Sequence, residues 1–403
     1  MKRRKNNSKG REISTNTIYT IAGTLVLNAV LQLILYPRMT RDMGSERMGT
    51  VLFVMGLVAI LSPSIGQSLN NGRLVLRRDH EVSNGDYFFA VLIFSLISLA
   101  VVLPFTVGSI GGPAAILPSA VLILLTSYRY YGDVEYRLSL QYRKFFFYYL
   151  AASVGYLSGY FIYRVTGSWY WAFLTGEIFA LVYVSLTGSV FKGFLTRSQN
   201  FRLVMGKGTL LVSSYLITNT TLNMDRLILK SMVGGEAVTI YYVASLIGKT
   251  LVLLVAPINT IIISYLTKEK VRLSRGQFLR YSGAGLLVSL FFLILCQIGT
   301  PLFVRLFYRD LTAGVAPLVT IVNLTQILAV LSAYLFMLVL TFADERWQLI
   351  LQALHLGVMM AMAIPMTLKS GLMGFSLAVM IANILRIAAV LCLGLVKLSG
   401  KRR

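Results

Sequence analysis

Long apolar stretches separated by short polar loops run the whole length of the chain. An apolar stretch of about 18 residues or more predicts a helix that crosses a membrane. The predicted spans are 14–36, 47–69, 86–107, 113–132, 145–163, 169–191, 208–230, 238–264, 281–303, 313–341, 347–368 and 372–396. The pattern therefore predicts an all-α, polytopic membrane protein with 12 transmembrane helices. Its longest loops are too short to bury a core, so any function must lie within the membrane or at its two faces.

The charge distribution predicts the orientation of these spans. The chain is 56% hydrophobic and only 13% charged, yet its formal net charge is +23. With the N-terminus in the cytoplasm, the Lys and Arg residues of inside loops outnumber those of outside loops about threefold, as the positive-inside rule expects. We therefore predict that both termini are cytoplasmic. The lipid bilayer accounts for the basic runs, so no nucleic-acid partner is expected.

Twelve spans divide naturally into two groups of six. The linker between them falls near residues 197–207, which predicts an N-terminal six-helix lobe at 1–197 and a C-terminal six-helix lobe at 198–403. Because six is even, both lobes enter the membrane in the same direction. If the lobes are repeats, their symmetry axis runs along the membrane normal.

Two cations, Lys249 and Arg386, lie near the middle of predicted spans. A charge at the bilayer centre costs roughly 2.5–3.5 kcal/mol, and from this depth neither side chain reaches the interface easily. Such residues normally face a wet interior, so we predict that they line an anion-binding cavity. A structural ion pair with Glu177 is the alternative. The scarcity of carboxylates within the spans, where Glu177 and Asp225 stand out, favours the cavity.

Further polar residues recur at helical spacing along the predicted spans. Amides that share a helix face predict a polar cavity lining, although hydrogen bonds between helices explain them equally well. Arg226 is the third predicted anion-binding cation, and three groups are candidates for proton or ion coupling, Asp225, Glu177 and His355. Arg38 and Arg41 are predicted either to form an outer gate with Asp42 or Asp225, or to act as membrane anchors. The predicted cavity amides are Asn28, Gln32, Asn219, Asn223, Gln352 and Asn383.

One segment resembles a known family. Residues 223–244 read NMDRLILKSMVGGEAVTIYYVA, and residues 39–49 read MTRDMGSERMG. Asp225, Arg226 and Tyr241 match a pattern of the Wzx-type polysaccharide (O-antigen) flippases of the MOP (MATE-like) superfamily, whereas Ile240 stands where that pattern has glycine or alanine. The resemblance implies two six-helix lobes around a V-shaped cavity that works by alternating access.

The same resemblance implies a substrate and a location. The substrate is an undecaprenyl-pyrophosphate-linked oligosaccharide, moved from the inner to the outer leaflet for surface polysaccharide or capsule synthesis. The expected location is the bacterial cytoplasmic (inner) membrane, with a polysaccharide polymerase and a chain-length regulator as further partners. Pyrophosphate fits the cationic residues, because Arg binds it bidentately and Lys supplies a point charge.

Two other classes of membrane protein compete with this interpretation. A MATE-type multidrug exporter has the same topology, but it exports cations and would be expected to line its cavity with carboxylates. A polysaccharide polymerase or transferase would need a large outer loop or a cluster of catalytic groups. The sequence has no nucleotide-binding loop, zinc-ligand spacing or nucleophile elbow, so we expect no enzyme, catalytic residue, metal or cofactor.

Overall fold

The protein is helical throughout the part of the chain that the computed structural model describes. The model describes the backbone of residues 2–109, 112–268, 273–344 and 346–399, and the side chains of these except residues 2–14, 105–106, 252–268, 346, 348–349 and 399. No strand occurs among these residues. The chain forms two compact units, the first of residues 1–43 and 50–224 and the second of residues 44–49 and 225–403.

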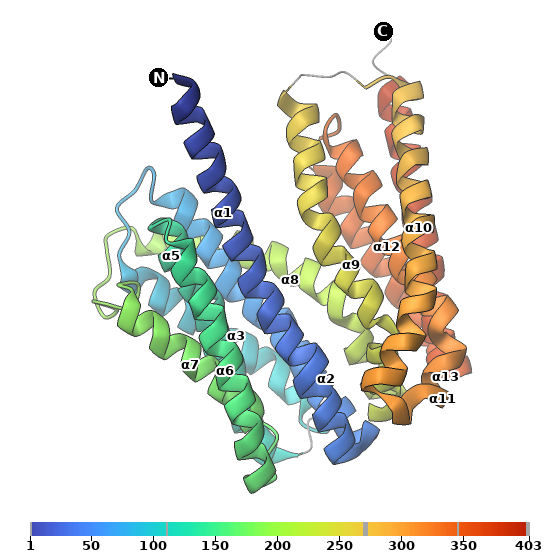
Figure 1. Cartoon of the computed structure of the whole chain (residues 1–403), viewed down its shortest axis with the longest axis horizontal. Coiled ribbons are helices and arrows are strands. Elements are labelled where there is room, and N and C mark those ends of the chain that lie inside the picture. The colour runs from blue at the N-terminus through green and yellow to red at the C-terminus, as the bar shows by residue number, and fades with distance from the viewer. Residues whose placement is uncertain (1, 110–111, 269–272, 345, 400–403) are drawn as a thin grey trace. The chain divides into compact units, whose positions relative to one another are not determined.

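The first unit contains helices from α1 to most of α8 (Figure 1). The helices α1 and η1 pack along α6, which packs on α7, while α4 packs on α7 and on α3. The six-residue segment η1 is a turn of π-helix near the end of the first predicted span, and it carries Gln32. The bounds are α1 Lys2–Ala29, η1 Val30–Leu35, α2 Tyr36–Leu76, α3 Asn84–Thr106, η2 Pro113–Ala115, α4 Ile116–Gly132, α5 Val134–Leu138, α6 Tyr142–Thr166, α7 Trp171–Thr187 and α8 Phe201–Met232.

Small residues bring α6 and α7 into close contact. A Cβ on Gly159 would lie 2.0 Å from Thr175 Oγ1, and one on Gly155 would lie 2.7 Å from the Cα of Gly176. The Thr175 hydroxyl donates a hydrogen bond to the Gly155 carbonyl oxygen. Close backbone approach of this kind is how helices associate where no hydrophobic effect drives them together. It also encloses the side chains that lie between α4, α6 and α7.

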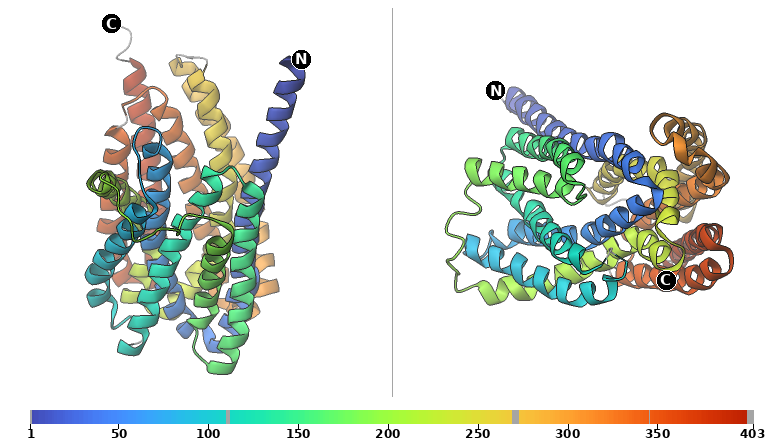
Figure 2. Two further views of the ribbon diagram at one scale, coloured as in Figure 1. Left: turned by 90° about the vertical axis from the view of Figure 1, so that its left-hand side faces the viewer. Right: turned by 90° about the horizontal axis from the view of Figure 1, so that it is seen from below.

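The second unit is built around α12, which packs against α9, α10 and α13 (Figure 2). Its apolar core includes Phe278, Phe336 and Val390. The chain reverses inside α13 at Ser370 and Gly371, where Gly371 has φ +54°, a conformation that glycine adopts without strain. We call residues 346–369 the first leg of α13 and residues 372–399 the second leg. The bounds are α9 Gly235–Lys268, α10 Arg275–Phe307, η3 Arg309–Leu311, α11 Thr312–Val315, η4 Ala316–Leu318, α12 Val319–Leu340 and α13 Arg346–Ser399.

A short piece of α2 belongs to the second unit. The helix breaks at Gly44, which has φ +81°, and residues 44–49 pack on the start of α9. Glu46 accepts hydrogen bonds from the backbone N–H groups of Gly235 at 2.9 Å and Glu236 at 2.7 Å. Because these donors are orphaned at a helix N-terminus, they lower the pKa of the Glu46 carboxyl. Glu46 therefore caps α9.

Every predicted span lies on a helix of the structure. Six described stretches are long and apolar enough to cross a membrane, and two of them, 15–76 and 350–398, each contain two predicted spans. The kinks at Gly44 and Gly371 divide these two stretches where the sequence predicts turns. The predicted spans on α4, α7, α8 and α9 are not among the six. Helices α4 and α7 have 17 residues each, and α8 carries more polar residues.

The boundary between the two units falls after residue 224, beyond the predicted linker at 197–207. Helix α8 runs unbroken from Phe201 to Met232, and its residues up to 224 belong to the first unit. The linker itself is held to the first unit, since the buried carboxylate of Asp86 accepts from the backbone N–H and the hydroxyl of Ser198. The predicted lobes at 1–197 and 198–403 remain a prediction about the membrane domains.

Candidate functional site

Lys249 of α9 forms an ion pair with Asp225 of α8. The Lys249 ammonium nitrogen lies 2.6 Å from Asp225 Oδ2. The two helices are joined by a tight turn and form a hairpin, which brings residues 24 positions apart into contact. Lys249 therefore has a carboxylate partner, as the ion-pair alternative expected. Its partner is Asp225, and not Glu177, because the hairpin places the nearer carboxylate directly opposite.

Arg226 adds a second cation beside this pair. Its guanidinium carbon lies 5.1 Å from the centre of the Tyr242 ring, and its charge acts on Lys249. We call Asp225, Arg226 and Lys249 the α8–α9 charge cluster, which carries one net positive charge. Among the described residues, Asp225 Oδ1 and Arg226 Nε are buried and have no hydrogen-bond partner. The cluster therefore has one uncompensated positive charge and two polar atoms that form no hydrogen bond within it.

Packing against α12 holds the face of α9 that carries Lys249. Gly248 lies against Gln326 of α12, where a Cβ would come within 2.5 Å of the Gln326 Cβ. Two turns earlier on α9, the Tyr241 hydroxyl is hydrogen-bonded to the same Gln326 side chain. A residue larger than glycine at 248 would push the two helices apart. This close approach fixes the rotation of α9 and hence the direction of the Lys249 side chain.

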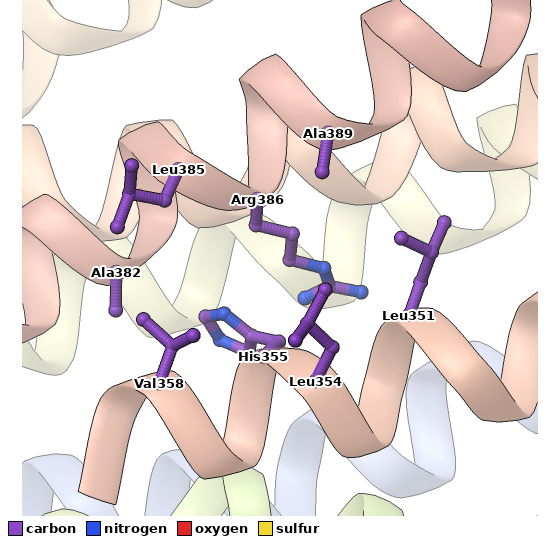
Figure 3. Close-up of a pocket in the computed structure, with 8 residues that line it drawn as sticks. All are labelled: Leu351, Leu354, His355, Val358, Ala382, Leu385, Arg386 and Ala389. Carbon is purple, nitrogen blue, oxygen red and sulfur yellow. The ribbon is translucent and has the colours of Figure 1, made fainter. Parts of the chain in front are cut away.

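Arg386 occupies a separate place in the second unit. It projects from the second leg of α13 toward His355 on the first leg, and both line a small cavity of about 40 Å³ (Figure 3). Apolar side chains, among them Leu351 and Leu354, form the remaining walls. The guanidinium carbon lies 6.0 Å from the Phe336 ring centre. Among the described side chains, Arg386 has no carboxylate partner, and Arg386 Nε and His355 Nδ1 have no hydrogen-bond partner.

The structure places Lys249 and Arg386 among different neighbours. Lys249 lies between α8 and α9, whereas Arg386 lies between the two legs of α13. The cavity beside Arg386 has the volume of about one water molecule and is too small for a pyrophosphate. A joint role of these cations in substrate binding thus remains a prediction.

Four of the six predicted cavity amides donate a hydrogen bond, two within their own helix and two to a neighbouring helix. Asn28 donates to the Thr24 carbonyl at 2.8 Å, Asn223 to the Asn219 carbonyl at 3.0 Å, Asn219 to the Ser64 hydroxyl at 2.9 Å, and Asn383 to the Thr325 carbonyl at 3.2 Å. Asn383 is also fully buried, as expected for a group that holds α13 to α12. Gln32 and Gln352 are half-buried.

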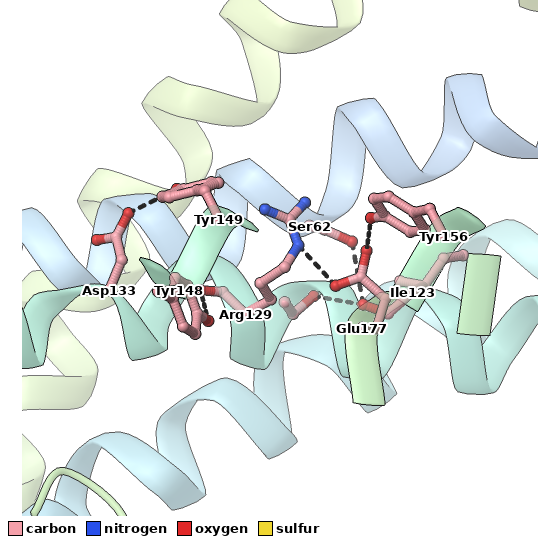
Figure 4. Close-up of polar contacts among 9 residues, drawn as sticks. Ser62, Ile123, Arg129, Asp133, Tyr148, Tyr149, Tyr156 and Glu177 are labelled. Carbon is pink, nitrogen blue, oxygen red and sulfur yellow. Dashed lines mark hydrogen bonds and ion pairs between the residues drawn. The ribbon is translucent and has the colours of Figure 1, made fainter. Parts of the chain in front are cut away.

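Glu177 forms an ion pair that the sequence analysis missed. Arg129 Nε lies 2.6 Å from Glu177 Oε2, and the Tyr156 hydroxyl donates to Oε1 at 2.5 Å (Figure 4). The guanidinium carbon of Arg129 also lies 4.5 Å from the Tyr130 ring centre. Arg129 lies near the end of the fourth predicted span, 113–132, beside several charged residues at its junction with the fifth. The signal that could have found it is Glu177, since a carboxylate within an apolar helix needs a cation on a neighbouring one.

A second carboxylate extends the polar core of the first unit. Asp133, also buried, lies 3.1 Å from Arg137 Nε and accepts from the Tyr149 hydroxyl at 2.8 Å. Asn70 of α2 donates to the same carboxylate. These contacts connect α2, α5 and α6 at one end of the unit. Every carboxylate oxygen named here has a partner, so this core is expected to act in folding.

The predicted outer-gate residues are exposed. Arg38 lies with its guanidinium carbon 5.8 Å from the Tyr160 ring centre, and Arg41 extends from the surface. Asp42 forms its ion pair with Arg164, at 2.8 Å, and accepts from the Tyr160 hydroxyl. The gate pairing predicted for Arg38 and Arg41 is therefore corrected, because Asp42 faces α6.

Comparison with known proteins supports the fold. No family model and no curated protein sequence matches the chain. An inward-facing multidrug resistance MATE family transporter of the MOP superfamily is 13% identical, with 96% of this chain and 95% of that chain covered and a TM-score of 0.64. A MOP superfamily transporter from Pyrococcus furiosus is 14% identical, with 97% and 96% covered and a TM-score of 0.63. A MATE structure in complex with MaD5 is 15% identical, with 97% of both chains covered and a TM-score of 0.62.

The chain therefore has the fold of the MATE transporters. This confirms the predicted all-α, polytopic membrane fold. Among the described residues, no group of three or more His, Cys, Asp or Glu side chains is placed to hold a metal ion.

Proposed function

We propose that this protein is a flippase that moves an undecaprenyl-pyrophosphate-linked oligosaccharide from the inner to the outer leaflet of the bacterial cytoplasmic membrane by alternating access. The observation that carries the proposal is the sign of the charge in the second unit. The α8–α9 charge cluster has one net positive charge, and Arg386 has no carboxylate partner among the described side chains.

The chemistry of the substrate matches this excess of positive charge. A pyrophosphate carries about two negative charges and several acceptor oxygens, which Arg and Lys bind with charge-assisted hydrogen bonds. In surroundings of low dielectric constant, these interactions are stronger than in water. An organic cation would instead be repelled by Arg226, Lys249 and Arg386.

The neighbour from Pyrococcus furiosus offers a parallel. It is described as a MOP superfamily transporter whose binding pocket has reverse polarity, which suggests a different function. In our proposal, this chain likewise departs from the cation exporters of the same fold. The cytoplasmic location of both termini, and a polymerase and chain-length regulator as partners, belong to the same proposal.

Multidrug export is the second candidate. It is favoured by the fold, because several structures of the same fold are multidrug resistance MATE transporters. Against it, Asp225 and Glu177, two carboxylates within predicted spans, each lie 2.6 Å from a cation and are already neutralised. Neither is free to receive a cationic drug.

A reconstituted transport assay separates the two candidates. Proteoliposomes carry a fluorescent undecaprenyl-pyrophosphate-linked oligosaccharide in one leaflet, and a membrane-impermeant quencher measures its arrival in the other. We expect wild-type protein to accelerate the movement, and Lys249→Ala or Arg386→Ala to slow it by about tenfold or more. Lys397→Gln is the matched control, since Lys397 forms an exposed ion pair with Asp344 at 3.2 Å.

The same vesicles also test the alternative. If the protein moves ethidium against a proton or sodium gradient and leaves the glycolipid where it was, multidrug export replaces the flippase proposal. If glycolipid movement survives Lys249→Ala and Arg386→Ala in the same chain, the cationic residues do not bind the substrate.

A further inference from the structure

We propose that Lys249 and Arg226 form an anion site in which Asp225 is the resident counter-ion, and that a phosphate-type anion binds by displacing Asp225 from Lys249. The inference rests on the proposed function and names the groups that would first bind the anionic part of the substrate. The exchange requires that Asp225 can leave Lys249, that Lys249 and Arg226 can bind the ligand in its place, and that the ligand can reach them.

Asp225 leaves part of its own hydrogen-bonding capacity unused. Only one of its oxygens, Oδ2, contacts Lys249, and Oδ1 is buried with no hydrogen-bond partner among the described residues. A buried acceptor without a partner costs free energy, so the paired state is not the best that these groups can achieve. In the first unit, by contrast, both oxygens of Glu177 are engaged, one by Arg129 and one by Tyr156.

The two positive charges of Arg226 and Lys249 exceed the one negative charge of Asp225. Arg226 is adjacent to Asp225 in the sequence and acts electrostatically on Lys249, but its Nε has no partner among the described residues. A phosphate or pyrophosphate group offers more charge and more oxygens than one carboxylate. It could contact the ammonium of Lys249 and the guanidinium of Arg226 together, which a single carboxylate oxygen does not do.

A ligand can also reach the site. The Lys249 side chain is 28% exposed, although it lies in the middle of a predicted span, whereas the Arg129 side chain is 5% exposed. Arg226 is half-buried as well. Lys249 is therefore the more accessible member of the pair, since the Asp225 side chain is 9% exposed.

The arrangement also provides a route to release. With the anion bound, the Asp225 carboxylate lies next to a like charge and is repelled by it. Re-formation of the Asp225–Lys249 pair would remove one of the cations from the ligand and weaken its binding. Asp225 thus competes with the substrate at every cycle, which prevents the site from holding its ligand permanently.

Binding of inorganic pyrophosphate to the purified full-length protein in nanodiscs tests the inference. The probe is titrated at low ionic strength by isothermal calorimetry. Asp225→Asn removes the competitor with little change of shape, so we expect pyrophosphate to bind about tenfold more tightly than to the wild type. Lys249→Gln should abolish binding, and Arg226→Gln should weaken it several-fold.

The matched control is Asp344→Asn, which makes the same carboxylate-to-amide change in the exposed Asp344–Lys397 ion pair of the second unit. It should leave pyrophosphate affinity unchanged. Equal affinity of the wild type and Asp225→Asn would overturn the inference, as would undiminished binding by Lys249→Gln. If Asp225→Asn does not fold, Arg226→Gln decides, because it leaves the Asp225–Lys249 contact intact and must still weaken binding.

The outcomes separate this inference from the proposed function. If Asp225→Asn tightens pyrophosphate binding but no glycolipid moves in vesicles, the anion site exists and the flippase proposal fails. If glycolipid moves and pyrophosphate affinity is insensitive to Asp225, the flippase proposal stands and the displaced counter-ion is wrong.

Discussion

Two ion pairs with the same separation of 2.6 Å differ in almost everything else. Arg129–Glu177, in the first unit, has side chains 5% and 3% exposed, while Lys249–Asp225, in the second, has side chains 28% and 9% exposed. Both oxygens of Glu177 have a partner, one in Arg129 and one in Tyr156, whereas only one oxygen of Asp225 has a partner. A short contact therefore does not by itself define a role. Enclosure, and partners for both oxygens of the carboxylate, distinguish the structural pair from the candidate site.

The physical basis of the difference lies in the helices around each pair. Arg129–Glu177 is enclosed by α6 and α7, which approach closely through glycines and bring the Tyr156 hydroxyl to the carboxylate. An enclosed charge without its partner is strongly unfavourable, so loss of one member of this pair alone should destabilise the protein. Lys249–Asp225 lies on a two-helix hairpin with an extra cation beside it, where a ligand can complete the bonding.

The largest effect is expected from breaking the enclosed pair. Arg129→Met leaves Glu177 as an unpaired buried charge, which should destabilise the protein by about 3–5 kcal/mol. Thermal unfolding in detergent measures this. Lys249→Met should cost clearly less, because the second pair is partly accessible. The double variant Arg129→Met with Glu177→Leu should recover most of the loss, and equal unfolding temperatures of the single and double variants would contradict the structural role.

The next effect concerns transport. Lys249→Gln should reduce glycolipid movement by about tenfold or more, since a charge-assisted contact is worth about 1.5–3 kcal/mol. The double variant in the first unit, once stable, should transport nearly as well as the wild type. Vesicle assays on the two variants give the comparison directly. If the first-unit double variant loses as much activity, then both pairs serve transport and the distinction drawn here fails.

Arg386 tests the same contrast with a cation that has no carboxylate at all among the described side chains. Because its apolar surroundings do not compensate the charge, Arg386→Met should raise stability by about 1 kcal/mol while transport falls. Unfolding temperature and glycolipid movement are measured on the same preparation. A decrease in stability would mean that Arg386 has a structural partner, and His355→Phe, which alters the opposite wall of the same cavity, is the control.

The smallest effect is expected at Glu46, which is exposed. Glu46 is 65% exposed, and its pKa is lowered by the N–H groups of Glu236 and Gly235 at the start of α9. A lowered folded-state pKa means that its contribution is present at neutral pH and is lost as the pH falls through that pKa. We expect the contribution of Glu46 to the free energy of unfolding to be below about 1 kcal/mol. The unfolding temperatures of the wild type and Glu46→Gln should therefore converge in acid, and a constant difference would contradict the cap.

Particular residues show how far the sequence alone could go. Apolar runs placed all twelve predicted spans on helices, and the turns at Gly44 and Gly371 fall between predicted spans. Lys249 and Arg386 were found because a cation inside an apolar run is recognisable by composition. Arg129 was missed because it lies near the end of α4 beside other charges, where composition does not separate a buried side chain from a loop residue.

The pairing of charges was beyond the sequence. Lys249 contacts Asp225, and Glu177 contacts Arg129, because of how each helix is rotated and how closely glycines such as Gly248 and Gly159 allow its neighbour to approach. Hydrophobicity along the chain determined where this protein crosses a membrane, since each span responds to its own residues. Only the tertiary structure decided which buried charge is neutralised and which stays accessible, since that depends on contacts between helices that no single span encodes.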